Sequence, residues 1–294
     1  MGFHYTDTLE KHNWVGGGLD AYIYHVTPTI VAKTVRRDRA SDEKKAEHPV
    51  VKEIAFYKSL KERRDQCPHI VECFLMLPDH LFLSYCAHKA LAPRLYERQE
   101  RERGPNGFHR RLIKVKEYED PGLIARWIQQ LTSALEYVEK MGFCHNDLHA
   151  SNCLLDSNFN LKLTDFGRAA TVGQPLEGVL SPRAGPKLAG PLKGTYGLCS
   201  ARTEHAAEWD RRFWELEFPD LERHEVFDGL ISACWHNVYP TMALVAYDFK
   251  RKAKHIMSDA EYTVIDSAKE RETCEALVRR GLLGPELAES FGPA

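Results

Sequence analysis

The sequence predicts an α+β protein of two lobes, in which a strand-rich N-terminal third precedes a mainly helical remainder. Short apolar runs of strand length, separated by turn residues, lie before residue 86, whereas the long helical periodicities lie after residue 119. This order is not a series of repeating βαβ units. At 294 residues with 43% hydrophobic composition, the chain is long enough to bury the core of one bilobal unit.

The N-terminal third contains a hairpin, a helix and two further strands. Ala21 to Val26 alternates in character, and the turn at Thr27-Pro28 separates it from the apolar run Ile30-Val31-Ala32. Pro49 after His48 predicts a helix start, because proline is tolerated in the first helical turn. Apolar residues follow at helical spacing at Val50, Ile54, Tyr57 and Leu60. The runs Ile70 to Leu75 and Leu81 to Tyr85 predict the further strands.

A long amphipathic helix is predicted next, with Asp120 as its N-cap, Pro121 in its first turn and Gly142 at its end. Its apolar face comprises Leu123, Ile124, Trp127, Leu131, Leu135 and Val138. A hairpin should follow, with Leu154-Leu155 and the alternation Leu161, Leu163 on either side of a turn at Asp156 to Asn160.

The remaining segments divide into loops and helices. The mixed charges from Arg94 to Glu119 predict a solvated linker, and the Gly/Pro-rich stretch Gly173 to Gly194 predicts a mobile loop. Phe227 to Tyr247 should form buried helix, and Asp259 to Arg280 an amphipathic helix that Gly281 ends. The tail after Gly284 is expected to fray.

Composition argues against several classes of protein. Lys plus Arg total 40 against 42 Asp plus Glu, so the net charge of -2 gives no field that favours nucleic acid. No run approaches the ~18 apolar residues of a membrane span, and we expect an intracellular protein, cytoplasmic, nuclear or both. The eight cysteines are scattered without metal-ligand spacing and are interpreted as free thiols.

The strongest motif is His145-Asn146-Asp147-Leu148-His149-Ala150-Ser151-Asn152, with Asp165-Phe166-Gly167 beginning 13 positions after Asn152. It resembles the catalytic loop and metal-binding motif of eukaryotic-type protein kinases. The resemblance implies a bilobal kinase-like domain over residues 14–284. Its small antiparallel β-sheet lobe with one helix would span about 14–85, and its mainly α-helical lobe about 90–284.

The resemblance also implies the chemistry, which is transfer of the γ-phosphate of Mg-ATP to a hydroxyl of a protein serine or threonine. Asp147 would accept the proton of the hydroxyl, while Asn152 and Asp165 would hold Mg²⁺ or Mn²⁺. Asn146 stands where many kinases have Arg, which makes regulation by loop phosphorylation less expected. His149 stands where Ser/Thr kinases usually have Lys, and the same pattern occurs in aminoglycoside- and choline-type kinases, so a small-molecule substrate stays open.

Lys33 closes the run Ile30-Val31-Ala32-Lys33, which resembles the strand whose lysine binds the α- and β-phosphates. Alternation along a strand puts Val31 on the same face as Lys33, where it is available to cover adenine. The acidic partner of Lys33 should come from the next helix. Glu53 fits best, because its competitor Glu47 precedes the helix start at Pro49.

Two backbone segments complete the expected nucleotide site. Gly16, Gly17 and Gly18 occupy the place of the phosphate-covering loop, although a plain turn is the alternative interpretation. Tyr85 to Ala87 should be the hinge whose backbone binds adenine.

The resemblance weakens after Glu204. Gly194-Thr195-Tyr196 and Ala201 to Glu204 are similar to the end of an activation segment, which favours a protein substrate over a small molecule. His205 to Glu217 is too charged for the buried helix that protein kinases place there, so this central helix is predicted to be shortened or missing. A catalytically impaired scaffold is therefore a further alternative. The presence of Lys33, Asp147 and Asp165 argues against it.

Overall fold

The computed structural model describes residues 9, 13–18, 20–36, 48–103, 109–173, 218, 220–221 and 224–291. They form two compact units, the first drawn from Met1–Gln66, Val71–Ala87 and Tyr262–Ala294 and the second from Cys67–Ile70 and His88–Glu261. In these described ranges, none of the helices has the length and apolar character needed to cross a membrane. A sheet-based unit and a mainly helical unit confirm the predicted α+β class.

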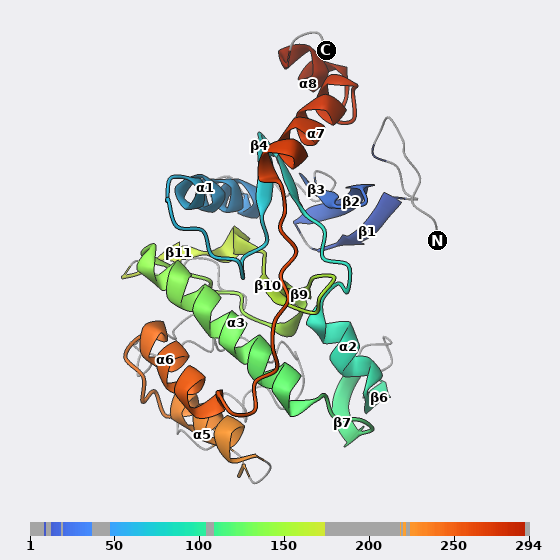
Figure 1. Ribbon diagram of the computed structural model, residues 1–294. Coiled ribbons are helices and arrows are strands. Elements are labelled where there is room, and N and C mark those ends of the chain that lie inside the picture. The colour runs from blue at the N-terminus through green and yellow to red at the C-terminus, as the bar shows by residue number, and fades with distance from the viewer. Residues whose placement is uncertain are drawn as a thin grey trace. The chain divides into compact units, whose positions relative to one another are not determined.

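The first unit is built on a five-stranded antiparallel sheet in the order β1-β2-β3-β5-β4 (Figure 1). Its strands are β1 (Trp14–Gly17), β2 (Ala21–Thr27), β3 (Ile30–Val35), β4 (Cys73–Leu77) and β5 (His80–Ser84). The predicted β2–β3 hairpin is confirmed, and β3 lies in the middle of the sheet between β2 and β5. This central place holds Lys33 on a strand that is hydrogen-bonded on both edges.

Helix α1 (Pro49–Lys61) begins where the sequence predicts. The His48 side chain accepts a hydrogen bond from the N–H of Val50, and Pro49 occupies the first turn. The buried side chains of the helix include Tyr57, whose hydroxyl donates to the carbonyl of Val71 at 3.0 Å. Glu53 lies among these buried side chains, and α1 therefore carries a carboxylate into the interior of the unit.

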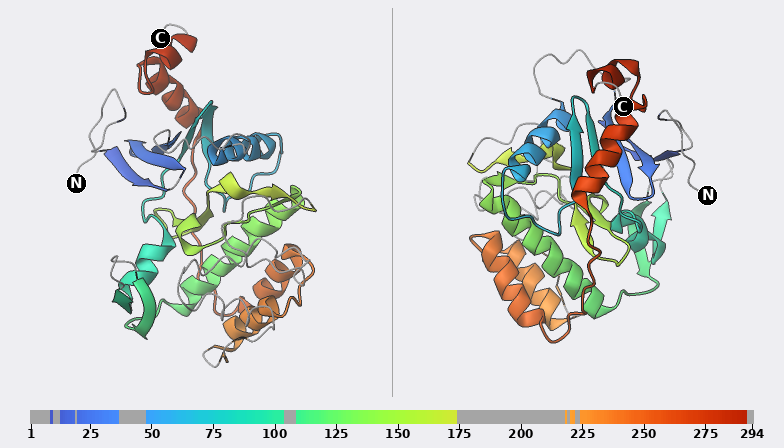
Figure 2. Two further views of the ribbon diagram at one scale, coloured as in Figure 1. Left: turned by 180° about the vertical axis from the view of Figure 1, so that it is seen from behind. Right: turned by 45° about the horizontal axis from the view of Figure 1, so that its top comes forward.

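The C-terminal helix α7 (Ser267–Arg279) completes the core of the first unit. It packs along β4, as Figure 1 and the right view of Figure 2 show. Thr29 Oγ1 donates to Glu270 Oε1 at 2.9 Å, and Ser267 hydrogen-bonds Glu72. The shared apolar cluster comprises Val26, Ile30, Ala32, Phe74, Leu75, Leu77, Phe82, Cys274, Leu277, Val278 and Leu282.

This packing corrects three expectations for the C-terminus. Residues 262–284 belong to the first unit and not to a second lobe of 90–284, because the apolar side of α7 is buried against the sheet. The helix begins at Ser267 and not near Asp259, and it does end before Gly281, whose φ is +91°. After Gly284 the chain forms α8 (Pro285–Ser290) and does not fray there.

The second unit is organised around α3 (Pro121–Lys140), whose N-cap Asp120 accepts from the N–H of Leu123 as predicted. Its other helices are α2 (Leu91–Glu97), α5 (Glu225–Trp235) and α6 (Met242–Ala253). Its strands are β6 (Gln99–Arg103), β7 (His109–Val115), β8 (Phe143–Cys144), β9 (Cys153–Leu155), β10 (Leu161–Leu163) and β11 (Ala170–Thr171). Phe227 to Tyr247 is thus helical in two parts, and α6 packs on α3.

An extended segment after α6 follows the N-terminal end of α3. The N–H of Ser258 donates to the carbonyl of Gly122 at 3.1 Å. A Cβ at Gly122 would lie 2.7 Å from the carbonyl oxygen of Ile256, so the close approach of the two backbones requires glycine. The segment ends at Glu261, whose carbonyl accepts from Asn160 Nδ2 at 2.6 Å.

The prediction of a solvated linker from Arg94 to Glu119 is wrong, because this region contains α2 and the β6–β7 hairpin. Opposite charges pair within it. Arg94 makes two hydrogen bonds to Glu119, Nε to Oε1 at 2.5 Å and Nη2 to Oε2 at 3.0 Å, and Arg98 Nε lies 3.0 Å from the same Oε1. Such bidentate pairs order a segment that composition alone presents as solvated.

Several expectations concern residues outside the described ranges. One is Glu47, the alternative partner of Lys33. The others are the part of the predicted loop that follows Gly173 and extends to Gly194, the segment from Gly194 to Glu204, and the shortened central helix predicted within His205 to Glu217. Among the described cysteines, Cys67, Cys73, Cys144, Cys153 and Cys274 are free thiols.

Candidate active site

The loop from His145 to Asn152 follows α3 and β8 and is fixed by a buried histidine. The His145 ring is only 1% exposed, and its Nε2 lies 2.9 Å from the carbonyl oxygen of Thr164. Its Nδ1 accepts from the N–H of Asp147 at 3.3 Å, so Nε2 carries the proton and donates to Thr164. Burial lowers the pKa of His145, which keeps the ring neutral. This histidine joins the loop to the segment that carries Asp165.

Asn152 holds Asp147 in place. The Asn152 Nδ2 atom donates to the backbone carbonyl of Asp147 at 2.8 Å and lies 3.4 Å from its Oδ2. The carbonyl of Asn152 accepts from the N–H of Thr164 at 3.0 Å. The two motif segments are therefore hydrogen-bonded to each other through both Asn152 and His145.

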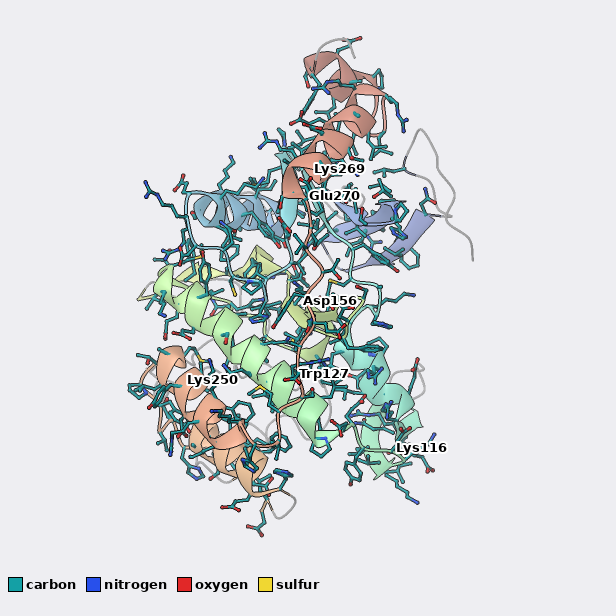
Figure 3. The ribbon with its side chains drawn as sticks, in the orientation of Figure 1. Lys116, Trp127, Asp156, Lys250, Lys269 and Glu270 are labelled. Atoms are coloured by element: carbon teal, nitrogen blue, oxygen red, sulfur yellow. The ribbon has the colours of Figure 1, made fainter. Side chains whose placement is uncertain are left out.

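The β9–β10 hairpin spaces Asn152 from Asp165, because β9 begins directly after Asn152 and β10 ends two residues before Asp165. Helix α3 anchors this hairpin. Gln130, which is 2% exposed, donates from Nε2 to Asn160 Oδ1 at 3.0 Å and accepts from the N–H of Leu161 at 2.7 Å. Trp127 Nε1 donates to the carbonyl of Phe159 at 2.7 Å (Figure 3, where Trp127 is labelled).

The turn of this hairpin is closed by Asp156, also labelled in Figure 3. Its Oδ1 accepts from the N–H groups of Asn158 and Asn160, each at 2.9 Å. These hydrogen bonds fix the turn between the two motif segments.

Asp165 adopts a left-handed backbone conformation, with φ of 64° and ψ of 67°. Left-handed conformations are strained for residues other than glycine, although aspartate tolerates them better than most, and they occur often at functional sites. The next residue, Phe166, is fully buried and meets the His145 ring edge-on at 5.0 Å between centroids. This contact anchors the segment immediately after Asp165.

Asp147 is paired with His149. The His149 Nε2 atom lies 3.7 Å from Asp147 Oδ2, and each side chain is 36% exposed. The contact with His149 lowers the pKa of Asp147, and the contact with Asp147 raises the pKa of His149. Asp147 is therefore held in its ionised form, as a proton acceptor requires.

In the first unit, Lys33 and Glu53 form a buried ion pair. The Lys33 Nζ atom lies 2.5 Å from Glu53 Oε2, with the side chains 10% and 0% exposed. The helix partner expected for Lys33 is thus the residue that contacts it. A buried charge is stable only when it is paired, so each of these two side chains needs the other.

We expect Glu53→Gln to destabilise the first unit by about 3–5 kcal/mol, because it removes the carboxylate that lies 2.5 Å from the buried Lys33 charge. Replacing both partners by apolar residues, in Lys33→Met/Glu53→Leu, should recover much of that stability. Urea unfolding monitored by fluorescence measures both changes. The exposed Glu62 at the end of α1 supplies the control Glu62→Gln, which should leave stability within about 0.5 kcal/mol of the parent. Equal effects of Glu53→Gln and Glu62→Gln would contradict the prediction.

The other residues expected at the nucleotide site lie in the first unit. Gly16 and Gly17 are in β1 opposite Ile23 and Tyr22, and the N–H of Gly18 donates to the carbonyl of Ala21 at 2.9 Å, which closes the hairpin. Val31 and Lys33 share one face of β3.

Of the hinge residues, Tyr85 uses its N–H to bind the carbonyl of Thr29 at 2.8 Å and stacks its ring on His25. The N–H of Tyr85 is therefore already engaged within the first unit. Ala87 is exposed and is the last residue of the first unit before His88.

The structure divides the predicted site residues between the two units. Lys33 and Glu53 meet in the first, and Asp147 and Asn152 meet in the second, where Asp165 also lies. Sequence reasoning missed the supporting role of Gln130. The sequence indicates this role only by placing a glutamine beside the apolar positions of an amphipathic helix.

The family model described as protein kinase domain matches residues 10–183. Tyrosine-protein kinase ABL2 of Homo sapiens is 28% identical over 246 residues, covering 76% of this chain and 18% of that protein. CBL-interacting serine/threonine-protein kinase 5 of Arabidopsis thaliana is 41% identical over 76 residues, covering 26% of this chain and 17% of that protein.

Serine/threonine-protein kinase ppk21 of Schizosaccharomyces pombe is 35% identical over 68 residues, or 23% of this chain and 12% of that protein. The chain therefore spans less than a fifth of the length of these relatives. The matched range 10–183 contains the expected phosphate-binding lysine and its acidic partner as well as the whole loop and metal motif. Since that range is more than half of the sequence, the chain belongs to the protein kinase family.

Proposed function

We propose that this chain is an ATP-dependent phosphotransferase that uses Mg²⁺ and transfers the γ-phosphate to serine or threonine hydroxyls of a protein. The observation that supports this most directly is the geometry of the loop, in which Asn152 holds Asp147 and His145 joins the loop to the segment of Asp165. Phosphoryl transfer depends on positioned groups and on charge neutralisation, and this loop presents both kinds of group.

In this proposal, Asp147 accepts the proton of the incoming hydroxyl, and the contact with His149, which lowers the pKa of Asp147, favours its ionised form. Lys33 binds the α- and β-phosphates and is held extended by Glu53. Val31 covers the adenine, and Tyr85 and Ala87 bind its edge through their backbone. Gly16, Gly17 and Gly18 form the backbone segment that covers the phosphates, with the N–H of Gly18 engaged by the carbonyl of Ala21.

The residues present fit a Mg²⁺ ion that is held by two protein side chains together with substrate phosphates. In the described part of the chain, no three His, Cys, Asp or Glu side chains cluster as a metal site. Mg²⁺ is commonly held by one or two protein oxygens together with substrate phosphates, which matches a pair such as Asn152 and Asp165. The amide nitrogen of Asn152 is engaged by Asp147, so its oxygen is the atom left for a cation. Bound Mg²⁺ supplies charge neutralisation at the phosphates.

The test of this function is phosphate transfer by the purified chain from radiolabelled ATP, with Mg²⁺ and separately with Mn²⁺. Acceptors should include a generic protein, peptide libraries that present only Ser, only Thr or only Tyr, and small hydroxyl compounds such as aminoglycosides and choline. Metal-dependent labelling of the Ser and Thr peptides supports the proposal. Labelling of small molecules alone would support the alternative substrate class that the His149 pattern leaves open.

We expect Asp165→Ala to abolish the stabilisation of the chain by Mg-ATP, because phosphates without a chelated cation repel the acidic groups around them. Thermal shift with ATP, in the presence and absence of Mg²⁺, measures it. Asp220→Ala removes an exposed aspartate outside both motifs and serves as the matched control. The role given to Asp165 is wrong if its alanine variant shows the metal-dependent shift of the parent.

The alternative of a catalytically impaired scaffold is less well supported by the site. Its predicted cause, the missing helix after Glu204, lies outside the described residues, whereas the contacts of Lys33 and Asp147 are present. Metal-dependent ATP binding without transfer to any acceptor would favour this scaffold function.

A further inference from the structure

His149 is placed so that its two ring nitrogens have different partners. It begins the short turn Ala150–Asn152, and its Nδ1 accepts a hydrogen bond from the backbone N–H of Ser151 at 3.2 Å. Its Nε2 lies 3.7 Å from Oδ2 of Asp147. The backbone carbonyl of His149 accepts from the N–H of Asn152 at 2.9 Å, which fixes the residue at the start of the turn.

These contacts define the tautomer of the ring. A ring nitrogen that accepts an N–H uses its lone pair and carries no proton, so neutral His149 is protonated at Nε2. The Nε2–H group is thus on the atom nearest to Asp147. The distance of 3.7 Å is longer than a hydrogen bond, and catalytic hydrogen bonds often shorten when substrate binds.

Two nitrogen donors approach the same carboxylate oxygen. Asn152 Nδ2 lies 3.4 Å from Asp147 Oδ2, and His149 Nε2 approaches that oxygen too. A carboxylate that is held through one oxygen is restricted in its rotation, and its other oxygen is directed away from the donors. Orientation of this kind can change the rate of a transfer step substantially.

We propose that His149 is a positioning residue that, together with Asn152, holds Oδ2 of Asp147 so that Oδ1 meets the acceptor hydroxyl. The inference rests on the proposed role of Asp147 as proton acceptor. His149 does not relay the proton onward. Its Nε2 already carries a hydrogen, and its Nδ1 is engaged by Ser151, so the ring acts by orientation alone.

The kinetic test compares His149→Ala, His149→Gln and the exposed control His255→Ala. We expect His149→Ala to lower kcat about tenfold with the KM for ATP within about twofold, because the orientation of Asp147 affects the transfer step and not nucleotide binding. Glutamine keeps a side-chain N–H donor, so His149→Gln should recover most of the rate. His255→Ala should match the parent, since His255 is exposed and lies outside both motifs.

The spectroscopic test does not depend on activity. Long-range ¹⁵N–¹H correlation spectra of ¹⁵N-histidine-labelled chain report the tautomer, and the His149 signals are assigned as those absent from His149→Gln. At a pH high enough for the His149 ring to be neutral, we expect the Nε2–H form. An Nδ1–H form, a parent-like kcat in His149→Ala, or a loss confined to the KM for ATP would each overturn the proposal. A parent that transfers phosphate to no acceptor would overturn the proposed function instead, while the tautomer would still test the pairing of His149 with Asp147.

Discussion

Asp147→Asn is expected to reduce the turnover number by about 10²–10⁴, because asparagine has no basic oxygen to accept the proton of the hydroxyl. The affinity for ATP should change little. Asn152 Nδ2 donates to the backbone carbonyl of Asp147, and the substitution retains that carbonyl, so the loop keeps its main support. Loss of rate without loss of fold is therefore the expected result.

Parallel measurements of kcat and of the dissociation constant for ATP test this prediction. Lys33→Ala is the comparison, because it removes a side chain that is proposed to bind phosphates and should weaken ATP binding. Circular dichroism and melting temperature check the fold of both variants, and Lys33→Ala is expected to melt at a lower temperature because it removes the cation that pairs with the buried Glu53. If Asp147→Asn weakened ATP binding as much as Lys33→Ala did, the separate role of Asp147 would have to be abandoned.

Leu277→Ala is expected to destabilise the first unit by about 2–5 kcal/mol, the range for truncating a buried leucine. Leu277 is 5% exposed in the cluster that α7 shares with β3, β4 and β5. Ala32 and Ile30 of β3 belong to this cluster, whereas Lys33 is on the opposite face of the same strand. Loosening of α7 should therefore also weaken nucleotide binding through Lys33.

Thiol labelling provides a direct measurement of this loosening. Cys73 on β4 and Cys274 on α7 are buried, and burial raises the pKa of each thiol to about 12, so both should react slowly in the parent. Leu277→Ala should speed their modification. The control Glu272→Ala changes an exposed residue of the same helix and should stay within about 0.5 kcal/mol of the parent. Equal labelling rates in all three chains would show that α7 is not part of the core.

The elements that the sequence predicts well are those whose signals are local. Asp120 and Pro121 define the start of α3, and turn residues separate β2 from β3, so their boundaries follow from neighbours in the chain. The kinase-like motif is also local, since Asp147 and Asn152 are five residues apart and hydrogen-bond directly. Glu53 is predicted as the partner of Lys33 because it follows the helical periodicity of α1 and because Lys33 lies at the end of a strand-like apolar run.

Other features depend on residues far apart in the chain, and no local pattern determines them. Arg94 and Glu119 look like members of a solvated charge run until the fold brings them together as a bidentate pair. The restriction at Gly122 comes from the backbone of Ile256, which meets it only in the folded chain.

Local sequence signals are sufficient to predict the α+β class, the start of α1, the limits of α3 and the residues that carry the kinase motif. Only the folded structure shows that α7 belongs to the sheet unit. An amphipathic helix shows from its sequence that it must bury its apolar face, but not which surface will cover that face. Cys274 and Val278 are buried against residues more than 190 positions earlier in the chain. Only the packing of the folded chain determines which of its apolar surfaces covers the helix.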